Sequence, residues 1–282
     1  MKKFYSLLFV ALAVVAMAQM FVSCEKENYV EPEPEPKPES KCQMTFTTAK
    51  SVGSSIFLII KKGNRPTEVI GAEAVFGTNP FDGGPGKDEE VVVLVLEKQS
   101  VTIKGDITHL TFYDPELTAL DVSQNPLLKY LKCSVGYSFL TSLDVSKNTA
   151  LETLVCDNNN LTSLDVSKNT ALQVLSCEEN NLTSIDISKN TELYAFSCAF
   201  NKITSLDISK NTKLRSLDCR SNKIKAEEMS KIINALPDWS AKKDEMRARI
   251  FVLATHPLSE ENEITEEAIK IAEEKNWEIF NY

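Results

Sequence analysis

Five cysteines recur at a nearly constant interval between residues 133 and 219, and regularly spaced thiols are the first candidates for chemistry. Cys156, Cys177, Cys198 and Cys219 stand 21 residues apart, and Cys133 precedes them by 23. Such a column could hold a metal or form disulfides, but zinc sites use close cysteine pairs whose ligands converge. Single cysteines pointing in parallel favour packing as small apolar side chains. We therefore predict no metal site and no cofactor.

Carboxylates follow the same period. They are Asp121, Asp144, Asp165, Asp186 and Asp207. Stacked about 5 Å apart, they could suggest calcium, but the spacing of an EF-hand loop is absent. A lysine stands three residues after four of them, at Lys147, Lys168, Lys189 and Lys210. This pattern favours a repeated turn in which aspartate accepts backbone N–H bonds and lysine offsets the repulsion.

Residues for catalysis or for nucleic-acid binding are scarce. The two histidines, His109 and His256, have no triad partner at a recognisable spacing, and the chain has no glycine-rich phosphate loop. We therefore predict no catalytic residues and no enzyme; an active site hidden in the terminal regions is the alternative. With 31 basic and 40 acidic residues, the net charge of −9 argues against binding nucleic acid, which needs a basic face.

The residues above belong to an internal repeat. Four 21-residue units follow one another at 140–160, 161–181, 182–202 and 203–223, and 117–139 is the same unit with two extra residues. In each unit, Leu154 and Cys156 or their equivalents are two apart and share one face of a strand. One unit cannot bury its apolar residues alone, so stacked units must share a core and place their strands about 4.8 Å apart. The 21-residue period is too short for a helix on the far side, so 161–166 should form short extended or 3₁₀ segments.

Rephased, each unit reads Leu-x-x-Leu-x-Cys-x-x-Asn-x-Leu, which resembles the leucine-rich repeat with Cys in place of the third Leu. The half that reads LTSLDVSKNT resembles the 21-residue version common in surface proteins of Bacteroidetes. The resemblance covers about 105–223 and implies an asparagine ladder whose buried amides bond the backbone. The ladder residues are Asn159, Asn180, Asn201 and Asn222. Gly136 occupies the nearest place in the first unit, so we expect a break and a bulge there, exposing Tyr137 or Phe139.

The predicted fold class is an α/β-type repeat solenoid, a leucine-rich repeat with a parallel β-sheet face, a small N-terminal β cap and an αβαβ C-terminal cap. The expected strands of the first cap are 55–61, 91–96 and 100–104. The second cap should contain a helix at 226–236, a strand at 249–253, a helix from Thr265 to about 275 and a strand at 277–282. The predicted segments are a signal peptide at 1–23, a linker at 24–42, the N-terminal cap at 43–104, the repeats at 105–223 and the C-terminal cap at 224–282.

The N-terminus predicts export and a lipid anchor. Two lysines precede the apolar run 7–18, which is typical of a signal peptide and short for a membrane span. Phe21-Val22-Ser23-Cys24 resembles the lipobox of bacterial lipoproteins, with Phe21 where Leu is usual; plain secretion and a retained anchor helix are the alternatives. The resemblance implies acylation of Cys24, with palmitate among the attached lipids, and membrane attachment through that anchor. The residues CEKEN that start at Cys24 resemble a surface-export signal, and EPEPEPKP favours an extended stalk. We therefore expect a bacterial outer-membrane lipoprotein exposed on the cell surface.

In leucine-rich-repeat proteins, ligands commonly dock on the outward residues of the strands, and these positions vary between units while the framework repeats. Alternation places the small residues Ala195, Ser197 and Ala199 outward in one unit. The candidate ligand-binding residues are His109, Tyr113, Tyr130, Lys132, Val155, Asp157, Ser176, Glu178, Asp218 and Arg220. We therefore expect a non-catalytic, adhesion-like surface protein that binds a macromolecule, with a protein as the first candidate ligand. A glycan-binding lipoprotein of a nutrient-uptake system and a structural surface spacer are the alternatives.

Overall fold

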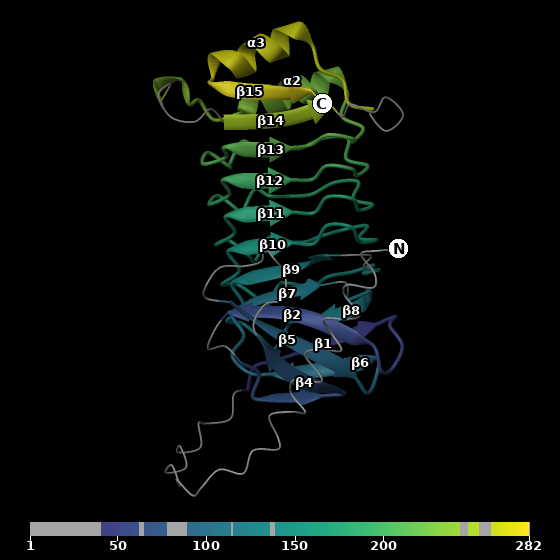
Figure 1. Ribbon diagram of the computed structural model, residues 1–282. Coiled ribbons are helices and arrows are strands. Elements are labelled where there is room, and N and C mark those ends of the chain that lie inside the picture. The colour runs from purple at the N-terminus through teal and green to yellow at the C-terminus, as the bar shows by residue number, and fades with distance from the viewer. Residues whose placement is uncertain are drawn as a thin grey trace, which may run out of the picture.

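The computed structural model describes residues 41–61, 65–77, 89–113, 115–135, 139–242, 248–253 and 261–281. Within them, an eleven-stranded sheet runs the length of an elongated molecule (Figure 1). Its order is β15 (Trp277–Asn281), β14 (Ala248–Leu253), β13 (Ser216–Asp218), β12 (Ala195–Ser197), β11 (Val174–Ser176), β10 (Thr153–Val155), β9 (Tyr130–Val135), β7 (His109–Tyr113), β2 (Ser55–Lys61), β5 (Glu89–Leu96) and β4 (Ala72–Gly77). A second sheet has the order β3 (Glu68–Ile70), β6 (Ser100–Lys104), β1 (Gln43–Thr48) and β8 (Leu117–Asp121).

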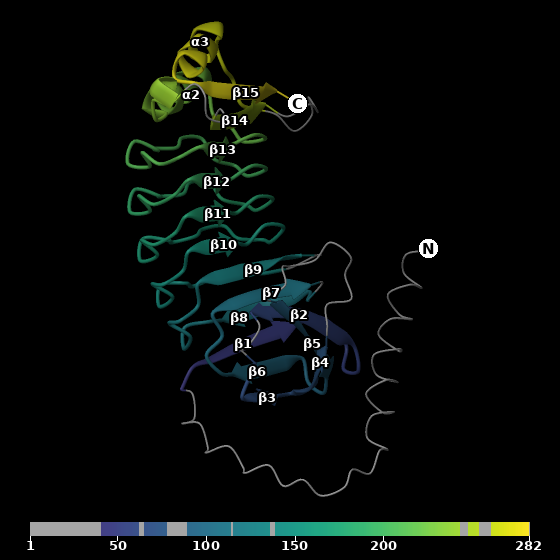
Figure 2. The ribbon, with the colours of Figure 1, turned by 60° about the vertical axis from the view of Figure 1, so that its left-hand side comes forward.

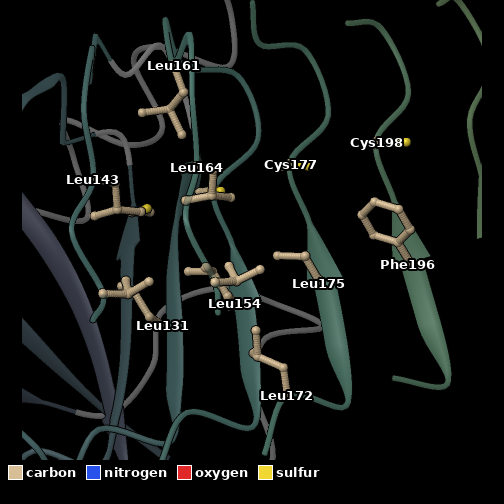
Figure 3. Packing of buried hydrophobic residues seen from close by; sticks show 14 of the residues in the cluster. Leu131, Leu143, Leu154, Leu161, Leu164, Leu172, Leu175, Cys177, Phe196 and Cys198 are labelled. Carbon is tan, nitrogen blue, oxygen red and sulfur yellow. The ribbon is translucent and has the colours of Figure 1, made fainter. Parts of the chain in front are cut away.

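The repeat units stack as parallel rungs in register. Leu154 pairs with Leu131 on one side and with Leu175 on the other, and Phe196 continues the row (Figure 3). The five repeat cysteines are fully buried in one file. The thiols of Cys133, Cys156, Cys177 and Cys219 each point to a carbonyl of the next rung, and the Cys156 thiol lies 3.5 Å from the Ser176 carbonyl oxygen. Burial raises the pKa of the Cys133 thiol to about 12. The prediction that these thiols pack as core residues is confirmed.

The predicted asparagine ladder is present and joins neighbouring rungs. The Asn180 side chain accepts from the Leu161 N–H at 2.9 Å and donates to the carbonyls of Cys156 and Cys177 at 3.0 and 3.2 Å. A second ladder, which the sequence analysis did not identify, consists of Asn125, Asn148, Asn169, Asn190 and Asn211. The Asn169 amide donates to the Val145 and Asn148 carbonyls, both at 2.9 Å. Both ladders are buried, so each rung is tied to its neighbour at two points inside the core.

In the four 21-residue units, the far side of the rung contains no helix and no strand. Residues 161–166 lack regular structure and end in a turn that the aspartate of the unit closes, because Asp165 accepts from the Ser167 N–H at 2.8 Å. That hydrogen bond lowers the pKa of Asp165, and the charge of Lys168 lowers it further. The predicted turn role of the aspartates is therefore confirmed, whereas the 3₁₀ alternative for 161–166 is wrong. In the first unit the equivalent segment is strand β8, because β1 pairs with it.

The expected irregularity of the first unit lies between β7 and β9. Their register shifts, so that Thr111 pairs with Lys132 but Tyr113 pairs with Val135, which leaves an extra residue on β9. Phe139 is 43% exposed, as predicted. Gly136 and Tyr137 lie outside the described residues. The bulge therefore lies on β9 just before the expected position, and β9 still pairs with both β7 and β10.

The N-terminal strands continue the sheet of the repeats. The predicted strands correspond to β2, β5 and β6, while β1, β3, β4 and β8 were not predicted. β2 pairs antiparallel with β7, so its backbone covers the open edge of the first repeat strand. One hydrophobic core extends from Met44 and Phe46 through every rung to Trp277, and Figure 2 shows the two ends on one continuous column.

The C-terminal segment follows the predicted order of elements. Helix α2 (Ala226–Ala235) buries Met229, Ile232 and Ile233, and helix α3 (Glu266–Glu274) begins where the Thr265 hydroxyl accepts from the Ala268 N–H. A 3₁₀ turn, η1 (Ser240–Lys242), follows α2. β14 and β15 add to the sheet parallel to β13, with both helices beside them (Figure 1). No helix among the described residues is long and apolar enough to cross a membrane.

Candidate functional site

The candidate site is the outer face, by which we mean the side of the long sheet opposite the repeat core. Strand alternation builds it, because Leu154 and its equivalents point into the core while Thr153 and Val155 point outward. Pairing aligns these outward residues in columns across the rungs: Val155 lies beside Lys132 on one side and Ser176 on the other, and Ser197 and Asp218 follow. The sheet therefore brings the predicted residues Lys132, Val155, Ser176 and Asp218 into one row.

Aromatic residues gather where β7 meets β9. The rings of His109 and Tyr130 stack with centroids 5.9 Å apart and planes 9° apart. Burial, followed by the charge of Lys61, lowers the pKa of His109, which favours the neutral form of its ring. The third predicted aromatic residue, Tyr113, packs with Phe57 against a small apolar cluster of Ile59, Val91 and Val93. The stacked rings of His109 and Tyr130 therefore offer a flat surface to a ligand at the β7–β9 end of the outer face. Tyr113 instead uses part of its ring to pack against the apolar cluster.

Two carboxylates occupy neighbouring positions on the middle rungs. Asp157 accepts from the Ser176 hydroxyl at 2.6 Å and from the Glu178 N–H at 2.9 Å. Glu178 accepts from the Ser197 hydroxyl at 2.5 Å. Burial raises the pKa of both carboxyl groups, and these hydrogen bonds offset part of that effect. Both side chains are therefore held in fixed positions without an ion pair of 4 Å or less to any other described residue.

Asp218 and Arg220 form a salt bridge with each other, with 2.7 Å between guanidinium and carboxylate. Asp218 is 9% exposed, so its carboxylate mainly positions Arg220. The guanidinium lies 5.0 Å from the centre of the Phe251 ring, and Phe251 stacks on Phe280 with centroids 4.9 Å apart. Arg249 stands over Phe280 at 5.8 Å. The outer face therefore continues across β14 and β15.

The sequence analysis missed Phe251 and Phe280 because the 21-residue period stops at Lys223. Structurally, β14 is a further rung: Ile250 pairs with Leu217, and the distant Asn262 takes the ladder position. The Asn262 side chain accepts from the Ile224 N–H at 2.9 Å and donates to the Cys219 carbonyl at 2.7 Å. The outward alternation of Arg249 and Phe251 in the predicted strand was the signal that could have identified this extension.

Rung β12 differs from the prediction at its edges. The expectation that Ala199 faces outward is wrong, because this side chain is fully buried. Ala199 follows the strand, and its side chain is a single methyl group. The longer Glu178 and Arg220 stand at the equivalent positions of the two neighbouring rungs, and their charges interact with each other. Two large residues at the ends of the same rung are exposed instead: Tyr194 at 47% and Phe200 at 39%. Strict alternation overlooked both, since Tyr194 precedes the strand and Phe200 follows it.

The chemistry of this face is that of a binding surface. Among the described residues, no group of three or more His, Cys, Asp or Glu side chains is gathered around a potential metal position. The outer face presents aromatic rings, hydroxyls, fixed carboxylates and guanidinium groups, which are the side chains that form contacts with proteins and sugars.

Comparison with known proteins matches one segment of these rungs to a family. Residues 157–173 match the family model described as Leucine Rich repeat. No curated protein matches the chain. Among solved structures, the functional domain of InlJ from Listeria monocytogenes, described as including a cysteine ladder, is 25% identical; the alignment covers 61% of this chain and 54% of that one, with a TM-score of 0.34. The chain thus spans about half the length of that domain.

Two further structures are similar. Internalin C2 from Listeria monocytogenes is 16% identical, with 62% of this chain and 81% of that chain covered and a TM-score of 0.43. A leucine-rich-repeat protein of Leptospira interrogans is 19% identical, with 56% and 44% covered and a TM-score of 0.41. The matched segment 157–173 belongs to a series of nearly identical units that stack in register. The chain therefore contains a leucine-rich repeat at 157–173, and the stacked units around it carry a buried cysteine where the third leucine of the repeat motif would stand.

Proposed function

We propose that this protein is a non-catalytic binding protein that holds a protein ligand on the outer face of its sheet. The observation that supports this most is the contrast between the two faces of each strand. The core residues are nearly the same in every repeat, whereas the outward column runs through Lys132, Val155, Ser176 and Ser197. Packing requires the first pattern but not the second, while a binding surface makes use of varied side chains.

The test places bulk on the outer face without disturbing the core. We would select a random 12-residue peptide phage library on the full chain and measure the affinity of the enriched peptides. Ser176→Arg with Ser197→Arg should weaken binding at least tenfold, because the two long side chains obstruct the face. The matched control, Ser163→Arg with Ser184→Arg, adds the same charge at exposed positions on the far side and should leave the affinity within twofold. Equal binding by both double variants would contradict the proposal.

A glycan ligand is the second candidate, and the His109–Tyr130 pair favours it. Two nearly parallel rings on a sheet face offer the flat apolar surface on which a sugar ring stacks. A glycan array probed with the full chain distinguishes the candidates. Hits that are lost in the variant His109→Ala with Tyr130→Ala would favour a role in nutrient uptake. An array without hits, together with peptides that depend on the outer face, would favour a protein ligand, and failure of both screens would leave the structural spacer.

We further propose that the protein is displayed on the cell surface by lipid attached to Cys24, which lies outside the described residues. The support is the lipobox-like sequence and the proline-rich linker that follows it. Metabolic labelling with an alkyne analogue of palmitate in a bacterial host should label the full chain. Cys24→Ser should remove the label and Cys42→Ser should retain it. Protease treatment of intact cells should degrade the labelled protein, and full protection would overturn the surface location.

A further inference from the structure

Rung β12 is the place on the outer face where the largest apolar side chains are exposed. Tyr194 and Phe200 stand at its two ends, and the short residues Ala195, Ser197 and Ala199 lie between them. The neighbouring rungs carry Gln173 and Glu179, or Arg215 and Ser221, at the two equivalent positions, so the aromatic pair is specific to β12.

The fold itself does not require these aromatic rings. The backbone at Phe200 is left-handed, with φ of 54°, as it is at Asn158, Glu179 and Ser221 in the other rungs. The left-handed backbone is therefore a feature of every one of these rungs, and asparagine or serine adopts it at the position where β12 has Phe200. A side chain that is 39% exposed contributes only part of its area to the core, so covering Phe200 with a partner would bury further apolar surface.

Carboxylates without cationic partners adjoin this rung. Glu178 and the exposed Glu179 lie on the rung next to Phe200, and Asp157 lies one rung further away. None of the three makes an ion pair with another described residue, whereas Glu152 is paired with Lys129. Lys132 and Arg220 act on Asp157 and Glu178 through their charges without forming an ion pair with them, and the Arg220 guanidinium is already bound by Asp218 at 2.7 Å. The side of β12 that faces β11 is therefore acidic.

We propose that β12 and its acidic border form the docking surface for a basic protein segment, which places Lys or Arg on Glu178 and Glu179 and an apolar side chain against Phe200. This inference rests on the proposed function and names the class of ligand. An incoming cation would supply the direct ion pair that these carboxylates lack. The net charge of −9 on the whole chain would attract such a segment at long range as well.

The peptides enriched on the full chain test this inference through their composition and their sensitivity to variants. They should carry net positive charge, with Lys or Arg close to an aromatic or aliphatic residue. Glu178→Gln with Glu179→Gln should raise their Kd at least tenfold. Asp165→Asn with Asp186→Asn removes the same charge from the far side of the molecule and should change Kd less than twofold.

The aromatic pair has matched substitutions within the repeat itself. Tyr194→Gln and Phe200→Asn introduce the residues that other rungs carry at these positions, Gln173 and Asn158, so the fold should be retained. Together they should raise the Kd of the basic peptides at least tenfold, with the far-ultraviolet circular dichroism spectrum unchanged. Unaltered binding by this variant would overturn the inference.

The result also separates this inference from the proposed function. Neutral or acidic peptides that are lost in the variant Ser176→Arg with Ser197→Arg would overturn the inference and leave the proposed function standing. Peptides that bind equally to every outer-face variant, or a library without enriched peptides, would overturn both.

Discussion

At the scale of single residues, the interior of each rung is held by amides as much as by apolar packing. Asn180 donates to three backbone carbonyls, of Cys156, Cys177 and Glu178, at 3.0 to 3.2 Å. It also accepts from the Leu161 N–H. A chain that bends once per strand leaves these backbone groups without ladder partners, and a buried asparagine satisfies all four.

Replacing Asn180 with alanine should therefore be costly. Asn180→Ala leaves several buried backbone groups unsatisfied, each of which costs about 1 to 3 kcal/mol before relaxation. We expect the free energy of unfolding to fall by about 2 to 4 kcal/mol in a urea titration. Asn160→Ala, at an exposed side chain in the same series of repeats, should change it by less than about 0.5 kcal/mol. Equal losses in the two variants would show that the ladder is not a source of stability.

At the scale of elements, a single glycine takes the chain from the small sheet to the long sheet in the N-terminal region. β3 belongs to the small sheet and β4 to the long one, and Gly71 alone lies between them. Its φ is +92°, and its carbonyl accepts from the N–H groups of Glu97 and Lys98 at 3.0 and 2.9 Å. A Cβ at this position would lie 2.5 Å from the Ser100 carbonyl oxygen. The crossing between the sheets therefore requires glycine.

Gly71→Ala tests this requirement against a matched glycine. The variant combines unfavourable φ with a backbone clash, so we expect a loss of about 2 to 4 kcal/mol in the free energy of unfolding. Gly53 has a similar φ of +87° but no atom within 4 Å of a Cβ, so Gly53→Ala should cost only about 1 kcal/mol. Thermal unfolding followed by circular dichroism measures both. A smaller loss at Gly71 than at Gly53 would contradict the account of the crossing.

At the scale of the whole molecule, each rung contacts mainly the rungs on either side of it. Equivalent positions of the repeat pair at every interface: Leu154 pairs with Leu175, and Leu175 pairs in turn with Phe196. Stability in such an array is approximately a sum over rungs and their interfaces. The length of the array is therefore adjustable, provided that the two terminal regions still cover its ends.

Insertion of a second copy of 161–181 after Asn181 should extend the column by one rung. The unfolding enthalpy should rise by about 15 kcal/mol, at roughly 0.7 kcal/mol per residue, and Tm should not fall. Differential scanning calorimetry measures both quantities. Insertion of 161–171 alone adds about half a rung and shifts every later cysteine out of the file, so it should lower Tm. A half-rung insertion as stable as the full one would contradict the stacked-rung account.

Much of the fold and part of the site follow from the sequence. Within the repeats, the 21-residue period and the two-residue step from Leu154 to Cys156 predict parallel rungs, a buried thiol file and the outward position of Val155. The same alternation predicts the outward place of Ser176. It fails at Ala199 and overlooks Phe200, because alternation applies only inside a strand and both residues lie beyond it.

What the sequence by itself determined is the repeating interior, because each unit carries the whole set of side chains that its neighbour needs. What only the tertiary structure decided is how that interior ends. Asn262 completes a ladder 40 residues after Asn222, Phe251 and Phe280 extend the outer face, and β1 turns 117–121 into a strand. These residues share no period, so long-range backbone pairing places them where the open edges of the array need partners.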